Sequence, residues 1–158
     1  MSMSIIPATV VESAFAVRRT IRIAAPIEKV WSAVTAPEHI SQWFGEARLD
    51  GRGVGARGTL TFPDYGAVPL RIEALDEPHT VTYRWGNDDA LGTPPAELDE
   101  ATATVFTFTL EPVDGGTQLT VVETGFEHTS DPAGNLEAHR QGWDGELDKL
   151  VALFEGGA

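Results

Sequence analysis

Cysteine is absent from this chain of 158 residues. Its absence excludes a disulfide framework, thiolate metal ligands and a cysteine nucleophile. Basic residues are scarce, because 11 Lys and Arg stand against 24 Asp and Glu and give a formal net charge of −13. Nucleic-acid binding depends on Lys and Arg side chains that neutralise phosphates, so we expect no nucleic-acid partner.

Long apolar runs are also lacking. No stretch approaches the roughly 20 residues that a membrane-spanning helix needs. Glu12 interrupts the mildly apolar start, and no basic residue precedes it, which is atypical of a signal peptide. The sequence therefore predicts a cytoplasmic protein without membrane insertion. Its hydrophobic content of 42% suffices for one core, and we expect an N-terminal extension over residues 1–14 and a single domain over 15–158.

Motifs that carry known chemistry are missing too: no G-x-S-x-G elbow, P-loop or H-E-x-x-H is present. Residues 53–58 (GVGARG) match the dinucleotide fingerprint literally, but a strand-like TLTF follows where that site needs a helix. Glu123, His128 and His139 have no short chelating spacing. We therefore expect no metal and no cofactor, and we assign no catalytic residue.

Alternating apolar and polar residues predict several strands. In residues 15–23, Val17, Ile21 and Ile23 share one parity, whereas Arg18 and Arg22 belong to the other. Further runs rich in Thr, Val and aromatic residues occupy 59–62, 68–75, 80–85, 103–110 and 117–126. The short turns between most of them favour an antiparallel meander.

Helical spacing appears in three segments. Residues 26–35 begin with Pro26, which suits a first helical turn, and Thr35 to Glu38 resembles a capping box for a second short helix through 39–44. Residues 135–155 form a long amphipathic helix with Trp143 at the centre of its apolar stripe. Only this helix is long enough to cover an apolar sheet face, and the space between the two is the default binding site.

The order of these motifs is similar to a known family. The segment from Ala25 to Trp31 followed by Pro37-Glu38 resembles a strand-to-helix signature of the START/Bet v1-like (SRPBCC) superfamily. Further motifs resemble the bacterial relatives of the Hsp90-ATPase activator, the Activator of Hsp90 ATPase homologue 1-like C-terminal domain family; they are Trp43-Phe44, Tyr83-Arg84-Trp85, Glu123 to Phe126, His139 to Trp143 and Leu147 to Leu150. The resemblance implies an α+β helix-grip fold, in which a curved antiparallel sheet wraps around a long C-terminal helix and two short helices follow the first strand.

The cavity that this fold implies suggests the ligand-binding candidates Trp31, Tyr83, Trp85, Phe106, Phe108, Glu123, His139 and Trp143. His139 lies on the apolar stripe, either as a polar anchor for a ligand oxygen or as a core histidine with a protein partner. Glu123 faces inward if Leu119 and Val121 do, and burial would raise its pKa; a salt bridge or a strand-edge position is the alternative.

Two further features bear on the cavity. Gly142 and Gly145 interrupt the last helix, which indicates either close packing or a bend that opens the cavity. Residues 86–101 (GNDDALGTPPAELDEA) lack strand periodicity and form either a lid or a solvated connection.

Three functions fit this sequence. The favoured one is binding of an apolar, lipid-like or aromatic small molecule, without demonstrated chemistry. A small-molecule enzyme, such as a cyclase or hydrolase that uses Tyr83, Glu123 and His139, is the first alternative. A co-chaperone or stress-related interaction module is the second, and a homodimer stays open.

Overall fold

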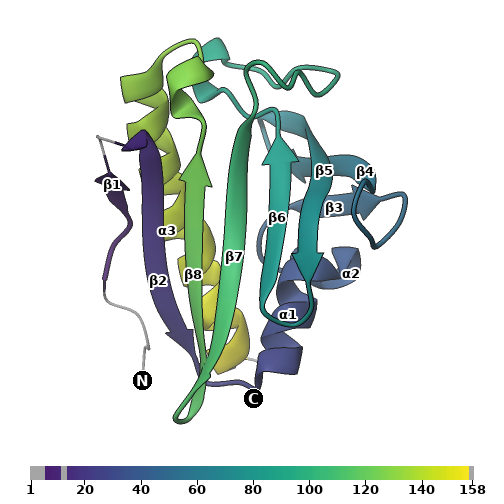
Figure 1. Cartoon of the computed structure of the whole chain (residues 1–158), viewed down its shortest axis with the longest axis vertical. Coiled ribbons are helices and arrows are strands. Elements are labelled where there is room, and N and C mark those ends of the chain that lie inside the picture. Colours follow the sequence, from purple (N-terminus) through teal and green to yellow (C-terminus); the bar gives the residue numbers. More distant parts are fainter. Residues whose placement is uncertain (1–5, 12–13, 157–158) are drawn as a thin grey trace.

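Eight strands of the described residues, 6–11 and 14–156, form one antiparallel sheet in this computed structural model. The order across the sheet is β1-β2-β8-β7-β6-β5-β4-β3, so β3 to β8 form the expected meander and β2 joins at β8 (Figure 1). The strands are β1 (Thr9–Val11), β2 (Ala16–Ile23), β3 (Glu46–Leu49), β4 (Arg57–Phe62), β5 (Gly66–Asp76), β6 (Thr80–Trp85), β7 (Thr104–Val113) and β8 (Gly116–Thr124).

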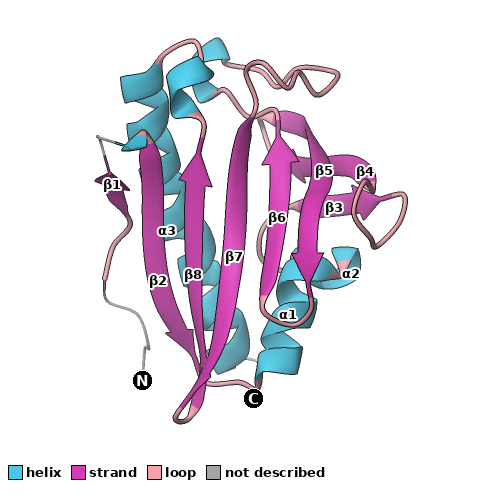
Figure 2. Ribbon diagram, viewed as in Figure 1, coloured by secondary structure: helices cyan, strands magenta, loops and turns pink. Residues whose placement is uncertain are grey.

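Helices cover one face of this sheet. The long helix α3 (Pro132–Gly156) runs behind β2, β8 and β7 in Figure 2, and the short helices α1 (Ile27–Thr35) and α2 (Pro37–Ile40) lie near the lower end of β5 and β6. Two 3-10 turns, η2 (Asp89–Leu91) and η3 (Phe126–His128), lie at the other end. This is the helix-grip fold that the sequence predicts.

The core lies between α3 and the sheet. Alternate residues of β7 and β8 point into it, as the two-residue period of a strand requires. Trp143 is only 2% exposed and packs against Phe106 with ring centroids 5.2 Å apart. The predicted phase of the terminal helix is therefore confirmed.

Two details of the sequence reading need correction, and a third stays open. Thr35 does not cap a helix, because its hydroxyl donates to the carbonyl of Trp31 at 2.7 Å, and α2 covers only Pro37–Ile40. The sequence predicts no strand between residues 45 and 58, but β3 lies there, because a four-residue strand is too short to show a period. The predicted N-terminal extension contributes β1, which pairs with β2; its boundary at residue 15 stays a prediction.

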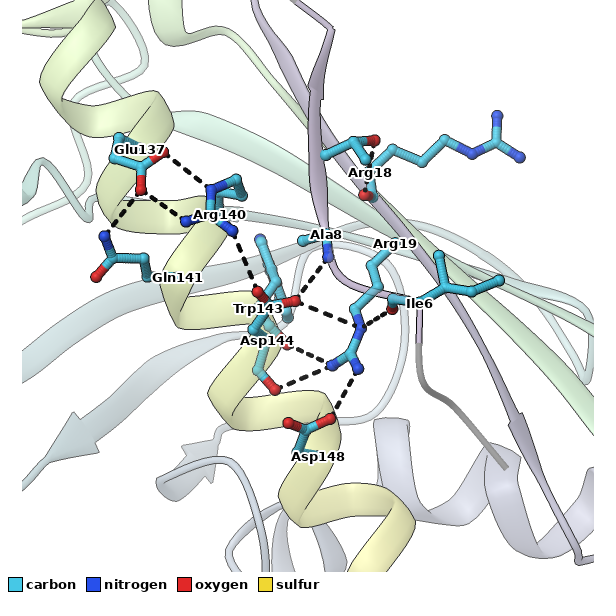
Figure 3. Close-up of polar contacts among 11 residues, drawn as sticks. Ile6, Ala8, Arg18, Arg19, Glu137, Arg140, Gln141, Trp143, Asp144 and Asp148 are labelled. Atoms are coloured by element: carbon cyan, nitrogen blue, oxygen red, sulfur yellow. Dashed lines mark hydrogen bonds and ion pairs between the residues drawn. The ribbon is translucent and has the colours of Figure 1, made fainter. Parts of the chain in front are cut away.

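A buried arginine fastens α3 to β2. Arg19 has the parity of Val17 and Ile21, so its side chain points to the helix and is 4% exposed. Figure 3 shows its guanidinium donating to the Asp144 carbonyl at 2.9 Å and to Asp148 Oδ1 at 2.7 Å. Asp144 Oδ1 also accepts the backbone N–H of Ala8 at 2.6 Å, so the same helical turn holds the segment before β1.

No helix within residues 6–11 and 14–156 combines the length and the apolar composition that crossing a bilayer requires.

We expect Arg19→Met to lower the free energy of unfolding by about 2–3 kcal/mol, because buried hydrogen bonds from a charged donor are lost. Urea unfolding of the wild type and the variant measures this difference. Arg22→Met is the matched control, since Arg22 is exposed on the same strand and should change stability by less than about 0.5 kcal/mol. Equal effects of the two substitutions would contradict the role of Arg19 in fastening α3 to β2.

Candidate functional site

A pocket of about 450 Å³ lies between α3, the β-sheet and the segment after β6. Its volume falls in the range of pockets that hold drug-sized molecules. Five aromatic residues, four polar or charged residues and three small residues line it: Phe44, Phe62, Tyr65, Trp85, Trp143, Asn87, Asp89, His139, Glu146, Gly92, Ala138 and Gly142.

The aromatic walls come from four separate parts of the chain. Phe44 follows α2, Phe62 ends β4, Trp85 ends β6 and Trp143 lies in the middle of α3. Their ring centroids are close, at 5.5 Å for Phe44 and Trp143 and 6.0 Å for the stacked pair Trp85 and Trp143. Such contacts stabilise the rings beyond their buried area, and the rings together form the aromatic wall of the pocket.

A single buried carboxylate ties these walls together. Glu123 shares the inward parity of Leu119 and Val121 on β8 and is fully buried. Its Oε1 accepts hydrogen bonds from His139 Nδ1 and Trp143 Nε1, both at 2.8 Å. Its Oε2 accepts from Trp85 Nε1 at 2.8 Å and from Thr104 Oγ1 at 2.5 Å. Four donors from three elements therefore converge on one side chain.

These donors reverse the pKa shift that burial alone predicts. Burial raises the pKa of Glu123, but the charge of His139 and the hydrogen bonds from His139, Thr104 and Trp85 outweigh it, and the pKa is lowered. The expectation of a raised pKa for a buried Glu123 is therefore wrong. Glu123 is an ionised structural acceptor rather than a proton donor.

His139 forms the positive half of this pair. Burial lowers the pKa of His139, but the charge and hydrogen bond of Glu123, the charge of Asp89 and the Asn87 carbonyl raise it more, so the net shift is upward. Its Nε2 donates to the Asn87 carbonyl at 2.9 Å. Both ring nitrogens thus have protein partners, as in the core-histidine interpretation.

Two buried polar atoms at the pocket have no such partner. The hydroxyl of Tyr65 and the side-chain oxygen of Asn87 make no hydrogen bond with any residue that the structure describes. Burial raises the pKa of Tyr65 to about 12, and the charges of Asp89 and Asp88 add to that shift, so the phenol is protonated near neutral pH. Buried polar groups normally find partners in the protein or in ordered water, so these two atoms are open to whatever molecule enters the pocket.

The segment between β6 and β7 forms one side of the pocket through Asn87, Asp89 and Gly92. It is anchored by Asp88, whose carboxylate accepts from the Ser130 backbone N–H at 2.8 Å and from Asn135 Nδ2 at 2.7 Å. The Ala90 N–H donates in turn to Asn135 Oδ1 at 3.1 Å. This segment is therefore fastened to the start of α3.

The two helical glycines do not mark close packing. A Cβ built at Gly142 or Gly145 would meet no atom within 4 Å apart from its immediate surroundings in the helix. Gly142 lines the pocket and Gly145 does not. The absence of a side chain at Gly142 therefore leaves space in the pocket that a larger residue would fill.

The structure brings only some of the predicted ligand residues to the pocket. Trp85, His139 and Trp143 line it, and Glu123 lies directly behind them. Tyr83, Phe106 and Phe108 surround a separate space of about 10 Å³, and Trp31 lines neither space. The Tyr83 hydroxyl donates to the Val34 carbonyl at 2.6 Å, and burial raises its pKa.

Sequence reasoning missed the residues at the other side of the pocket. Phe62 lies in a predicted strand, but its inward direction depends on the register of β4 against β5. Tyr65 occupies a tight turn, and Asn87 and Asp89 lie in a segment without periodicity. The motif Trp43-Phe44 was the one sequence signal for this side of the pocket. Its two rings stack with centroids 4.8 Å apart, and Phe44 lines the pocket.

Fold and pocket together define a helix-grip protein with an aromatic cavity beside its C-terminal helix. Residues 24–155 match the family model described as Activator of Hsp90 ATPase homolog 1-like protein. The match covers most of the chain, and the chain belongs to this family. No curated protein matches it in sequence.

Several solved structures are similar. The protein MLL2253 from Mesorhizobium loti has 27% identity and a TM-score of 0.75, with 90% of this chain and 98% of that chain covered. DynU16, a protein in the dynemicin biosynthetic locus, has 25% identity and a TM-score of 0.71; 90% of this chain aligns with 48% of that chain. The Aha1 dimer from Colwellia psychrerythraea shares the fold, with 20% identity, a TM-score of 0.69 and coverage of 89% and 96%.

We expect Glu123→Gln to destabilise the protein by about 3–5 kcal/mol, because it leaves the His139 cation buried without its counter-charge. Chemical denaturation at pH 6 measures the change. Glu111→Gln is the control, since Glu111 is exposed on the neighbouring strand β7. A loss below about 1 kcal/mol at Glu123 would mean that the carboxylate is not the organising acceptor.

The pair should also set a pH window of stability. The lowered pKa of Glu123 stabilises the fold above its ordinary value of 4.5, and this contribution is lost as the pH falls through the lowered pKa. The raised pKa of His139 stabilises the fold below its ordinary value of 6.5, and this contribution is lost as the pH rises through the raised pKa. Nitrogen NMR should therefore find both His139 ring nitrogens protonated at pH 6.5, and a neutral ring at that pH would contradict the ion pair.

Proposed function

We propose that this protein binds an apolar, aromatic small molecule in the pocket between α3 and the sheet and carries out no chemistry on it. The observation that carries the proposal is the pocket itself, about 450 Å³ in volume and walled by five aromatic rings. Aromatic walls with a few polar groups are typical of small-molecule sites. The similarity to DynU16, a protein in a biosynthetic locus, supports binding of a small molecule in general.

The hydrogen bonds of the buried polar groups argue for binding rather than catalysis. The enzyme alternative rests on Tyr83, Glu123 and His139. Tyr83 donates to a backbone carbonyl, and Glu123 and His139 hold each other and the surrounding rings. A general acid or base must reach the proton that it transfers, and these groups are already engaged in holding the walls.

The exposed apolar residues give less support to an interaction module. The large ones among the described residues come from the segment before β2, the loop before β4, the end of β5 and η2. Single exposed apolar residues are ordinary on protein surfaces, whereas docking sites are contiguous patches. The pocket is therefore the stronger candidate for function.

Substitution of the two helical glycines tests the proposal. Gly142→Leu should fill the pocket and weaken binding of the neutral naphthalene dye prodan at least tenfold. Gly145→Leu is the matched control, because it adds the same side chain to the same helix outside the pocket lining and should leave the dye affinity unchanged. Both variants should remain folded, since leucine has a higher helix propensity than glycine by roughly 0.8 kcal/mol.

Fluorescence titration measures the dye affinity, and thermal melts check the folding of each variant. Equal weakening by both substitutions would place the dye elsewhere on the protein. No saturable binding to the folded wild type would overturn the proposed function.

A further inference from the structure

Resting on the proposed small-molecule function, the geometry points to a narrower ligand class. We propose that the pocket selects an aromatic compound that carries a protonated amine, and that it discriminates against carboxylates. Three observations carry this inference: the charges around the pocket, the polar atoms without partners, and the rings that line it.

The charges around the pocket are predominantly negative. Asp89 and Glu146 line it, Glu123 lies behind it, and Asp88 is close enough to affect Tyr65. Two cations oppose these four carboxylates. His139 is held by Glu123 at 2.8 Å, and Lys149 Nζ lies 2.7 Å from Glu146 Oε1.

His139 is the only cationic side chain among the described residues that line the pocket, and its two ring nitrogens already donate to Glu123 and to the Asn87 carbonyl. A ligand carboxylate would therefore meet no available positive partner, and it would enter a negative field. Fatty acids and aromatic acids are disfavoured for this reason.

The unmatched polar atoms favour a ligand that donates hydrogen bonds. The Asn87 side-chain oxygen can only accept, and the Tyr65 hydroxyl can accept as well as donate. Asp89 adds a carboxylate whose nearest cation, His139 Nε2, is 3.7 Å away and is shared with Glu123. An ammonium group offers three donors and a positive charge, which matches both features.

The rings add a third attraction. A cation above the face of Trp, Tyr or Phe is attracted by the negative charge of the π-system, and Trp is the strongest partner. Trp85 and Trp143 stack at 6.0 Å and line the pocket with Phe44, Phe62 and Tyr65. The aromatic part of the ligand would bury its face against the same rings.

A matched series of probes tests the inference. Calorimetry at pH 7 compares 2-naphthylmethylamine, 2-naphthylmethanol and 2-naphthoate, which share one ring system and differ in charge. We expect the amine to bind about tenfold more tightly than the alcohol, and the alcohol about tenfold more tightly than the carboxylate. Asp89→Asn and Glu146→Gln should each reduce the ratio of amine to alcohol affinity several-fold.

A surface control separates local from overall charge. Glu155→Gln removes the same single charge from the far end of α3, where Glu155 is exposed, and should leave the affinity ratio unchanged. An equal fall in all three variants would assign the preference to the net charge of −13 and overturn the inference.

The outcomes also separate this inference from the proposed function. If the alcohol binds and the amine has no advantage, the binding function stands and the ligand class is wrong. If prodan binds in the pocket but none of the three probes does, the ligand class is again wrong. If neither prodan nor any probe binds, both proposals fail.

Discussion

Burial of the Glu123 carboxylate constrains the rest of this structure. An ionised carboxylate without partners would cost several kcal/mol in the interior, so the elements around it have to supply donors. β6 supplies Trp85, β7 supplies Thr104, and α3 supplies both His139 and Trp143. The indole N–H groups fix how the two tryptophan rings are turned, and the rings in turn form the pocket wall. A polar requirement in the core thereby determines the shape of an apolar cavity.

The helix α3 is held at a second point, on the side facing β2. Arg19 binds the carbonyl of Asp144 and the carboxylate of Asp148. Both residues follow Trp143 along α3, and Trp143 donates to Glu123. The register of β2 against β8 pairs Val17 with Glu123 and Arg19 with Val121. The two side chains that hold α3, Arg19 and Glu123, therefore come from adjacent strands at neighbouring positions. Translation or rotation of α3 would break the contacts of both. The pocket is therefore preformed, which lowers the ordering cost of binding.

Much of this fold could be predicted from the sequence, because its signals are local. The strand at 80–85, the stripe on α3 and the burial of Trp143 follow from periodicity alone. Arg19 and Glu123 show where periodicity fails: the parity places both inside, but an arginine or a glutamate is normally read as exposed unless a partner is known. The α3 partners of Arg19 lie 124 or more residues away in sequence, and those of Glu123 lie 16 or more residues away. Tyr65 lies in a turn, Asn87 in irregular chain after β6 and Asp89 in η2, where no strand or helix period exists to place them.

The polar groups around the pocket divide into those that the protein uses itself and those that are open to the proposed ligand. His139 and Tyr83, the polar residues that the sequence favoured as ligand contacts, form hydrogen bonds within the protein instead. The ring nitrogens of His139 bind Glu123 and the Asn87 carbonyl, and the Tyr83 hydroxyl binds the Val34 carbonyl. Such groups maintain the walls whatever the ligand is. Tyr65 and Asn87 carry buried polar atoms with neither a hydrogen bond nor an ion pair to the described residues. Asp89 and Glu146 are ionisable groups with raised pKa values, chiefly through burial. Desolvated groups gain most from a matching ligand and lose most from a mismatched one, so under the proposed function discrimination between ligands would rest on these four residues at the pocket.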